Sequence, residues 1–128
     1  MTILRYIVTD VDRSVAFYQK HFGFALRKLI GSAIANVAKD DLSLWLSGPE
    51  SSAGQPLSDQ SRPVPGGWNR FLIQVPDLDA RVESLRREGV KFRGEIVAGS
   101  GGRKIIVEDP DGNPIELFEM GSSRSSPP

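Results

Sequence analysis

Hydrophobic and polar positions repeat along this chain with an offset of 67 residues. The stretch 8–12, Val-Thr-Asp-Val-Asp, corresponds to 75–79, Val-Pro-Asp-Leu-Asp. The hydrophobic positions that follow keep the offset and pair Val11 with Leu78, Val15 with Val82, and Tyr18 with Leu85. Their spacing of i, i+4, i+7 is that of one face of an amphipathic helix. The chain therefore contains two copies of one strand–helix unit.

Each copy is predicted to contain five elements in the order strand, helix, strand, strand, strand. In the first copy the expected strands are 3–9, 24–29, 33–38 and 42–46, and the helix is 12–22 with Asp12 as its N-cap. In the second copy the expected strands are 68–75, 90–97, 103–108 and 115–120, and the helix is 79–88. Gly23 and Gly89 follow the helices, where a left-handed residue commonly ends a helix. The sequence Asp-Pro-Asp-Gly at 109–112 predicts a tight turn.

The segment 48–67 differs from both copies because it has almost no hydrophobic periodicity. It contains four prolines, four glycines and several serines. A connection of this length inside a compact domain is unusual, and binding lids are common exceptions. Two interpretations stay open, a solvated tether or a mobile lid at the mouth of a binding site. The tail 121–128 consists of Gly, Ser, Pro and one Arg, and we expect it to be disordered.

Composition narrows the classes of function. The chain has 16 basic and 16 acidic residues, so no global field favours nucleic acid or an anionic membrane. No hydrophobic run approaches the roughly 20 residues of a membrane span. Cysteine is absent, which excludes disulfides, thiol nucleophiles and zinc–thiolate sites. We expect a cytoplasmic protein without nucleic-acid or membrane partners.

Two segments carry a resemblance to a known family. They are 9–18, Thr-Asp-Val-Asp-Arg-Ser-Val-Ala-Phe-Tyr, followed by Gly23-Phe24, and 108–117, Glu-Asp-Pro-Asp-Gly-Asn-Pro-Ile-Glu-Leu. With the repeat between them, the chain resembles the vicinal oxygen chelate superfamily, which includes glyoxalase I, extradiol dioxygenases and bleomycin-resistance proteins. The resemblance implies an α+β fold of two βαβββ modules that form a curved mixed-sheet cup with the helices outside. A single glyoxalase-like domain would then cover 1–120, with module one at 1–47, the linker at 48–67 and module two at 68–120.

The resemblance also indicates where metal-dependent members hold a divalent cation. The corresponding positions here are Ile3, Trp45, Arg70 and Glu116. Only Glu116 can ligate a cation, because Ile and Trp offer no suitable donor and Arg is itself a cation. We therefore expect no metal and no other cofactor. The single histidine, His21, is expected at the surface of the outer helix rather than in a catalytic site.

Side chains alternate along strands, so residues in step with these four positions should face the cup. The set mixes aromatic, aliphatic and charged residues, as small-molecule pockets do. The candidate ligand-binding residues are Arg5, Trp45, Arg70, Gln74, Glu116 and Phe118. We expect Arg70 and Glu116 to converge as an ion pair, or through a shared ligand or water.

Two functions remain open. The first is a metal-independent binding protein of the bleomycin-resistance type, which holds an aromatic or amphipathic small molecule in the cup. The alternative is a lyase, isomerase or dioxygenase of the same superfamily that uses Glu116 as a base or residual ligand. Unpaired edge strands of two modules also predict a homodimer, whose cup closes within one chain or between two swapped chains.

Overall fold

The computed structural model describes residues 1–121 and divides into two compact units. The first unit comprises Met1–Gly66 together with Pro110–Asn113. The second comprises Gly67–Asp109 and the chain from Pro114 onward. The boundary at Gly66 assigns the predicted linker to the first unit, and the tail expected to be disordered lies, apart from residue 121, outside the described residues.

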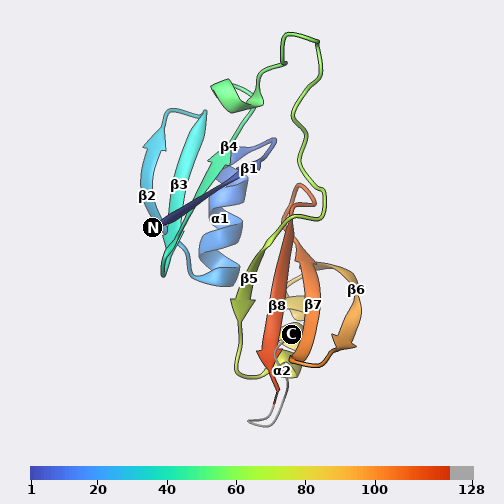
Figure 1. The fold of residues 1–128 in the computed structure, drawn as a ribbon. Helices are drawn as coiled ribbons and strands as arrows, with labels where there is room; N and C mark the ends of the chain where they lie inside the picture. The colour runs from blue at the N-terminus through green and yellow to red at the C-terminus, as the bar shows by residue number, and fades with distance from the viewer. Residues whose placement is uncertain (122–128) are drawn as a thin grey trace. The chain divides into compact units, whose positions relative to one another are not determined.

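The first unit is a four-stranded mixed sheet with one helix (Figure 1). Its elements are β1 (Thr2–Ile7), α1 (Val11–Phe22), β2 (Ala25–Ile30), β3 (Ile34–Lys39) and β4 (Leu42–Ser47). The strand order is β1-β4-β3-β2, with β1 and β4 parallel and the other pairs antiparallel. The parallel pair follows from the helix, since a crossover is needed to return the chain in the same direction.

The second unit repeats this architecture. Its elements are β5 (Phe71–Gln74), α2 (Leu78–Arg87), β6 (Lys91–Ala98), β7 (Gly102–Glu108) and β8 (Pro114–Met120). The order β5-β8-β7-β6 corresponds strand for strand to the first sheet, again with one parallel pair. The predicted α+β fold of two βαβββ modules is confirmed.

Both helices begin one residue earlier than predicted, at Val11 and Leu78, and the N-cap of α1 lies two residues before the one proposed. Asp10, and not Asp12, is the N-cap of α1, and its carboxylate accepts a hydrogen bond from the backbone N–H of Arg13 at 3.0 Å. Asp77 caps α2 in the same way, accepting from the N–H of Ala80 at 3.1 Å. The expected starts were wrong because an N-cap has extended backbone and lies just before the first buried residue of the helix. Asp12 instead lies in the first turn, where a negative charge complements the helix dipole.

Each sheet packs one face against its helix, and the core residues on that face alternate along the strands with the residues proposed to face a ligand. In the first unit the buried strand residues include Tyr6, Leu44, Leu46, Ala35 and Val37, and Val8 is buried just after β1. In the second they are Ile105, Val107, Ile115 and Leu117. The buried residues of α1 and α2, among them Tyr18 and Leu85, belong to the same cores. The other face of each sheet is therefore left for the residues proposed to bind a ligand.

Two local expectations need correction. His21 is buried rather than at the surface, with its ring centroid 5.0 Å from that of Phe17, because it lies on the helix flank that turns toward the core. The strand expected at 68–75 is reduced to Phe71–Gln74. Its first residues turn away because the carbonyls of Gly67 and Trp68 accept hydrogen bonds from arginine side chains rather than from a neighbouring strand.

The turns behave as the glycines indicate. Gly23 ends α1 with φ of +70°, and Gly112 closes the 109–112 turn with φ of +82°. Between 48 and 67 the only regular element is one turn of 3-10 helix, Ser52–Gly54. Among the described residues, neither helix has the length and hydrophobicity to cross a membrane.

Asn113 ties three distant parts of the first unit together. Its side-chain amide donates to the carbonyl of Ile7 at 2.9 Å, at the end of β1. Its side-chain oxygen accepts from the N–H of Gly66 at 2.8 Å, at the end of the long connection. The side chain is buried, so each of these hydrogen bonds satisfies a group that has little access to water.

Candidate functional site

In the first unit, the sheet face opposite the helix carries Arg5 and Trp45. They are register partners on β1 and β4, so their side chains project from the same face. The Arg5 guanidinium lies 5.4 Å from the Trp45 ring centroid and donates to the hydroxyl of Ser47 at 3.1 Å. The structure therefore brings these two predicted residues together as a cation–π pair.

Beside Trp45 the same face is hollowed into a pocket of about 120 Å³. It is lined by Lys28, Ile30, Ile34, Asn36 and Trp45. Four of these residues lie on β2 and β3. They were not among the predicted site residues, because the strands that hold metal ligands in metal-dependent relatives correspond to β1, β4, β5 and β8. One available signal was Asn36, a polar residue between the buried Ala35 and Val37.

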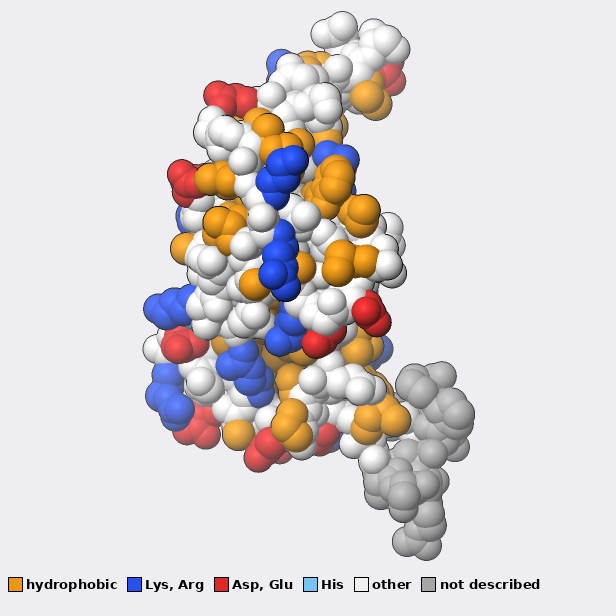
Figure 2. Space-filling model, turned by 90° about the vertical axis from the view of Figure 1, so that its left-hand side faces the viewer, with side chains coloured by type: hydrophobic (Ala, Val, Ile, Leu, Met, Phe, Trp, Pro, Cys, Tyr) orange, Lys and Arg blue, Asp and Glu red, His pale blue; other side chains and the backbone are white. Residues whose placement is uncertain are grey.

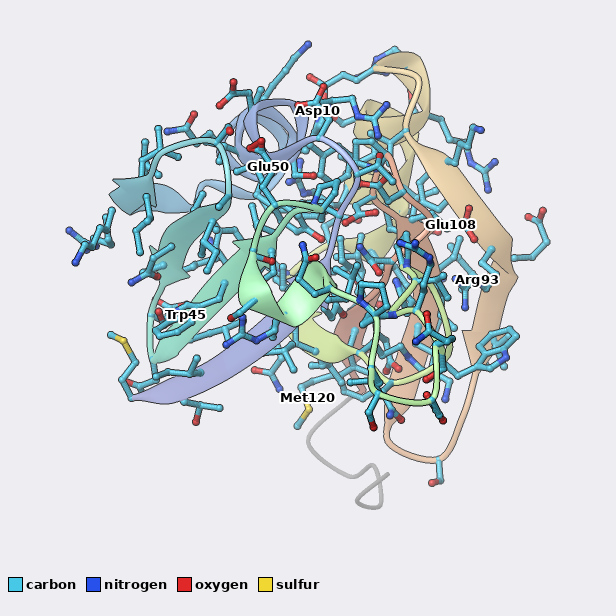
Figure 3. The ribbon with its side chains drawn as sticks, turned by 90° about the horizontal axis from the view of Figure 1, so that it is seen from above. Asp10, Trp45, Glu50, Arg93, Glu108 and Met120 are labelled. Carbon is cyan, nitrogen blue, oxygen red and sulfur yellow. The ribbon has the colours of Figure 1, made fainter. Side chains whose placement is uncertain are left out.

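Of two polar side chains that line this pocket, Asn36 has a hydrogen-bond partner for its oxygen and Trp45 has none for its indole nitrogen within residues 1–121. Asn36 accepts a hydrogen bond from the hydroxyl of Ser43 at 2.6 Å, which assigns its oxygen to that side. The indole nitrogen of Trp45 is buried and has no hydrogen-bond partner within residues 1–121. An unpaired buried N–H costs stability, so this donor identifies a place where a ligand or water completes the structure. Figure 3 shows Trp45 on its strand, seen from above.

In the second unit, Arg70 and Glu116 form the expected ion pair. The Arg70 guanidinium contacts one carboxylate oxygen of Glu116 through Nε at 2.9 Å and through Nη2 at 2.8 Å. Arg70 also donates to the carbonyl of Trp68 at 2.9 Å, which fixes its direction. The side chain of Glu116 is 10% exposed and that of Arg70 is 25% exposed. The prediction that they converge is confirmed.

Gln74 and Phe118 lie on the same face of the second sheet as register partners of β5 and β8. Phe118 is buried and lines a pocket of about 180 Å³ with Lys104 and the loop from Gly99 to Gly102. Gln74 is exposed. Gln74 lines a different hollow of about 450 Å³, together with Val75, Pro76, Glu119 and Met120.

A second ion pair on this sheet was not predicted. Arg93 of β6 contacts Glu108 of β7 at 2.9 Å, as the labels of Figure 3 allow the reader to follow. The same guanidinium lies 4.4 Å from the Trp68 ring centroid and donates to the carbonyl of Gly67 at 2.6 Å. Only the register between the strands brings Arg93 and Glu108 together, and the sequence spacing alone does not fix that register because β6 is irregular after Arg93.

A network around Arg103 lies at the start of α2. Arg103 binds Asp79 at 2.7 Å and Glu119 at 3.0 Å, and Glu119 also accepts from the N–H of Leu78 at 3.0 Å. The Leu78 N–H and then Arg103 lower the pKa of Glu119, and hydrogen bonds from Arg103 lower that of Asp79. Hydrogen bonds to Asp79 and then Glu119 raise the pKa of Arg103. These contacts anchor the helix and involve none of the predicted ligand-binding residues.

The donor set at the four positions that bind metal in relatives does not fit a divalent cation. Ile3 is 58% exposed and hydrophobic, and the Trp45 indole offers a proton rather than a lone pair. The single carboxylate, Glu116, is already bound to Arg70. Within residues 1–121, no group of three or more His, Cys, Asp or Glu is placed to hold a metal ion.

Comparison with known proteins agrees with the fold. Residues 2–117 match the family model described as Glyoxalase/Bleomycin resistance protein/Dioxygenase superfamily. A lactoylglutathione lyase of Haemophilus influenzae is 33% identical over 130 residues, covering 97% of this chain and 93% of that protein. A lactoylglutathione lyase of Arabidopsis thaliana is 30% identical over 123 residues, covering 91% of this chain and 42% of that protein. The chain spans less than half the length of the plant relatives it matches.

Among solved structures, the chain is similar to TnmS3, described as an antibiotic binding protein from Streptomyces sp. CB03234. The identity is 26%, the TM-score is 0.67, and the match covers 93% of each chain. These relatives therefore include proteins named for a reaction and a protein named for binding, on one fold.

Proposed function

The chain belongs to the glyoxalase/bleomycin resistance protein/dioxygenase superfamily, and on this premise we propose that it is a metal-independent small-molecule-binding protein. Its ligand is aromatic or amphipathic and binds on the open sheet faces. The proposed binding residues are those named above, Arg5, Trp45, Arg70, Gln74, Glu116 and Phe118. The likeness to an antibiotic binding protein supports binding as a role that this fold performs.

The observation that carries the proposal is the ion pair between Arg70 and Glu116. Nη2 and Nε of the Arg70 guanidinium both contact one carboxylate oxygen of Glu116, at 2.8 and 2.9 Å. A divalent cation at this position would have to compete with a fixed positive charge a few ångströms away. The arginine supplies the charge that a metal supplies elsewhere in the family, so the carboxylate is neutralised without a cation.

A second candidate function is favoured by the names of the relatives. Several proteins of about 30% identity are lactoylglutathione lyases. A lyase, isomerase or dioxygenase reaction here would use Glu116 as its base, after the contact with Arg70 has been broken or rearranged. This alternative requires a mobile Arg70, whereas the binding role does not.

Metal content and activity separate the two candidates. We expect the purified protein to hold no stoichiometric nickel, zinc, manganese or iron, to show no thermal shift with these ions, and to lack lactoylglutathione lyase activity when they are added. Stoichiometric, tightly held metal or metal-dependent lyase activity would overturn the binding proposal. A thermal-shift screen of aromatic and amphipathic compounds then identifies ligands, because a ligand that binds only the folded state raises the melting temperature. Trp45→Ala should abolish that rise.

We further propose a cytoplasmic homodimer. The support for the dimer is that each sheet ends in strands with a free edge, β1 and β2 in the first and β5 and β6 in the second. All six residues of β2 are exposed, including Leu26, Leu29 and Ile30. Light scattering tests the dimer, and a monomer at micromolar concentration would refute it. The cytoplasmic location rests on the cysteine-free composition, since no disulfide is needed for stability.

A further inference from the structure

The pocket beside Trp45 is lined by a lysine and by no acidic residue, and the indole N–H of Trp45 has no acceptor within residues 1–121. We infer that it takes the anionic end of an aromatic ligand, such as an aryl carboxylate. This inference rests on the proposed binding function and specifies the chemical class of the ligand. It concerns the first unit alone, where all five lining residues and Arg5 lie.

Two neutral donors point to a ligand that brings lone pairs. The Trp45 indole N–H is buried, and no acceptor for it exists among the described residues. Asn36 uses its oxygen to accept from Ser43, which leaves its NH₂ group as the part of the amide that remains to be bound. A ligand with carboxylate or phenolate oxygens satisfies both donors, whereas a ligand with only N–H groups satisfies neither.

Two cations give the pocket its charge. Lys28 lines the pocket and forms no ion pair within residues 1–121. Arg5 lies over the Trp45 ring and donates to the Ser47 hydroxyl, and it too has no carboxylate partner there. None of the five lining residues is acidic. Figure 2, viewed from the side on which β2 lies in Figure 1, shows Lys and Arg side chains among hydrophobic ones on the first unit.

The remaining walls suit an aromatic ring. Ile30 and Ile34 are register partners on β2 and β3, so their side chains stand together beside Trp45 on the same face of the sheet. The pocket volume of about 120 Å³ is close to the roughly 150 Å³ of a cavity known to hold benzene. A single ring therefore fills the pocket, and its acidic group, like the rest of a larger ligand, would lie at the open face of the sheet.

The test uses three one-ring probes that differ in charge, namely benzoate, benzylammonium and benzyl alcohol. Each is titrated into the full chain while the indole N–H resonances are followed by ¹H–¹⁵N NMR. The chain has two tryptophans, and Trp68→Phe assigns the Trp45 resonance. Benzoate should move that resonance downfield, because the N–H gains an acceptor, and should bind at least about tenfold more tightly than benzylammonium.

Two charge-matched variants locate the effect. Lys28→Gln should weaken benzoate binding about three- to fivefold and leave benzyl alcohol unchanged. Lys20→Gln removes the same charge from α1, outside the pocket, and should change neither. Equal affinity for the three probes would overturn the anion preference while leaving small-molecule binding intact. Failure of all three to perturb the Trp45 resonance would overturn both the inference and the part of the proposed function that involves this face.

Discussion

Removing the Arg70 side chain leaves the Glu116 carboxylate without its cation in a place with little water. Exposed ion pairs contribute about 0–1 kcal/mol, and breaking a fully buried pair costs about 3–5 kcal/mol. With side chains 10% and 25% exposed, this pair lies between those limits. We therefore expect Arg70→Ala to lower the free energy of unfolding by about 2–3 kcal/mol. Part of the loss comes from the bond to the Trp68 carbonyl.

The double variant separates the loss of the Arg70–Glu116 attraction from the cost of leaving the Glu116 carboxylate unpaired. Arg70→Met combined with Glu116→Leu removes both charges and fills similar volume, so it should cost no more than about 1 kcal/mol. Arg87→Ala is the control, because it breaks an exposed pair with Glu83 in the same unit and should cost about 0.3–0.5 kcal/mol.

Urea unfolding followed by circular dichroism measures these proteins together with the single variants Arg70→Met and Glu116→Leu, which the double variant combines. A loss of stability in Arg70→Ala no larger than that in Arg87→Ala would show that Glu116 does not need Arg70 as its partner. The same conclusion would follow if the double variant lost as much stability as the two single variants added together, because the two side chains would then act independently.

Three further predictions follow from the structure. Gly102→Ala should lower the free energy of unfolding in urea by about 3–5 kcal/mol, because a Cβ there would clash with the Glu119 carbonyl oxygen. Gly99→Ala, whose Cβ would meet no atom of residues 1–121 beyond its chain neighbours closer than 3.9 Å, should be neutral, and equal midpoints for the two variants would contradict this. Because the pKa of Glu119 is lowered, the ionised carboxylate stabilises the folded state at pH values above its ordinary pKa of 4.5, and this stability is lost as the pH falls through the folded-state pKa. The loss of unfolding free energy in Arg103→Gln, measured in urea, should therefore shrink in acid rather than stay constant. Subtilisin should first cut within 48–67, and a first cut inside either sheet would remove support for a mobile lid.

The order of elements could be predicted because it depends on local pattern. Alternation along strands and the i, i+4, i+7 stripe identified both modules, and the buried face of each sheet has the predicted parity. The pair of Arg70 and Glu116 was predictable because both occupy positions that converge in the family. Helix starts were displaced because either of two aspartates can cap, and the choice depends on which following residue is buried.

The pocket residues on β2 and β3 were not predictable in the same way. Lys28 and Asn36 are brought to Trp45 by the antiparallel register of neighbouring strands, and β2 shifts register between Leu26 and Lys28. A shift of one residue reverses the face of every side chain that follows, so the pattern alone cannot assign Lys28 to the pocket. The pairing of Arg93 with Glu108 escaped prediction for the same reason.

The hydrogen bonds of Asn113 have a consequence for the order in which the chain folds. They join residues 106 and 47 positions apart in sequence, at the carbonyl of Ile7 and the N–H of Gly66. During synthesis the strands and helix of the first unit leave the ribosome well before Asn113, the residue that holds the end of β1. Contacts of such separation form slowly, because a long loop must close first. The first unit therefore cannot form these two hydrogen bonds until the 109–112 turn and Asn113 have been synthesised.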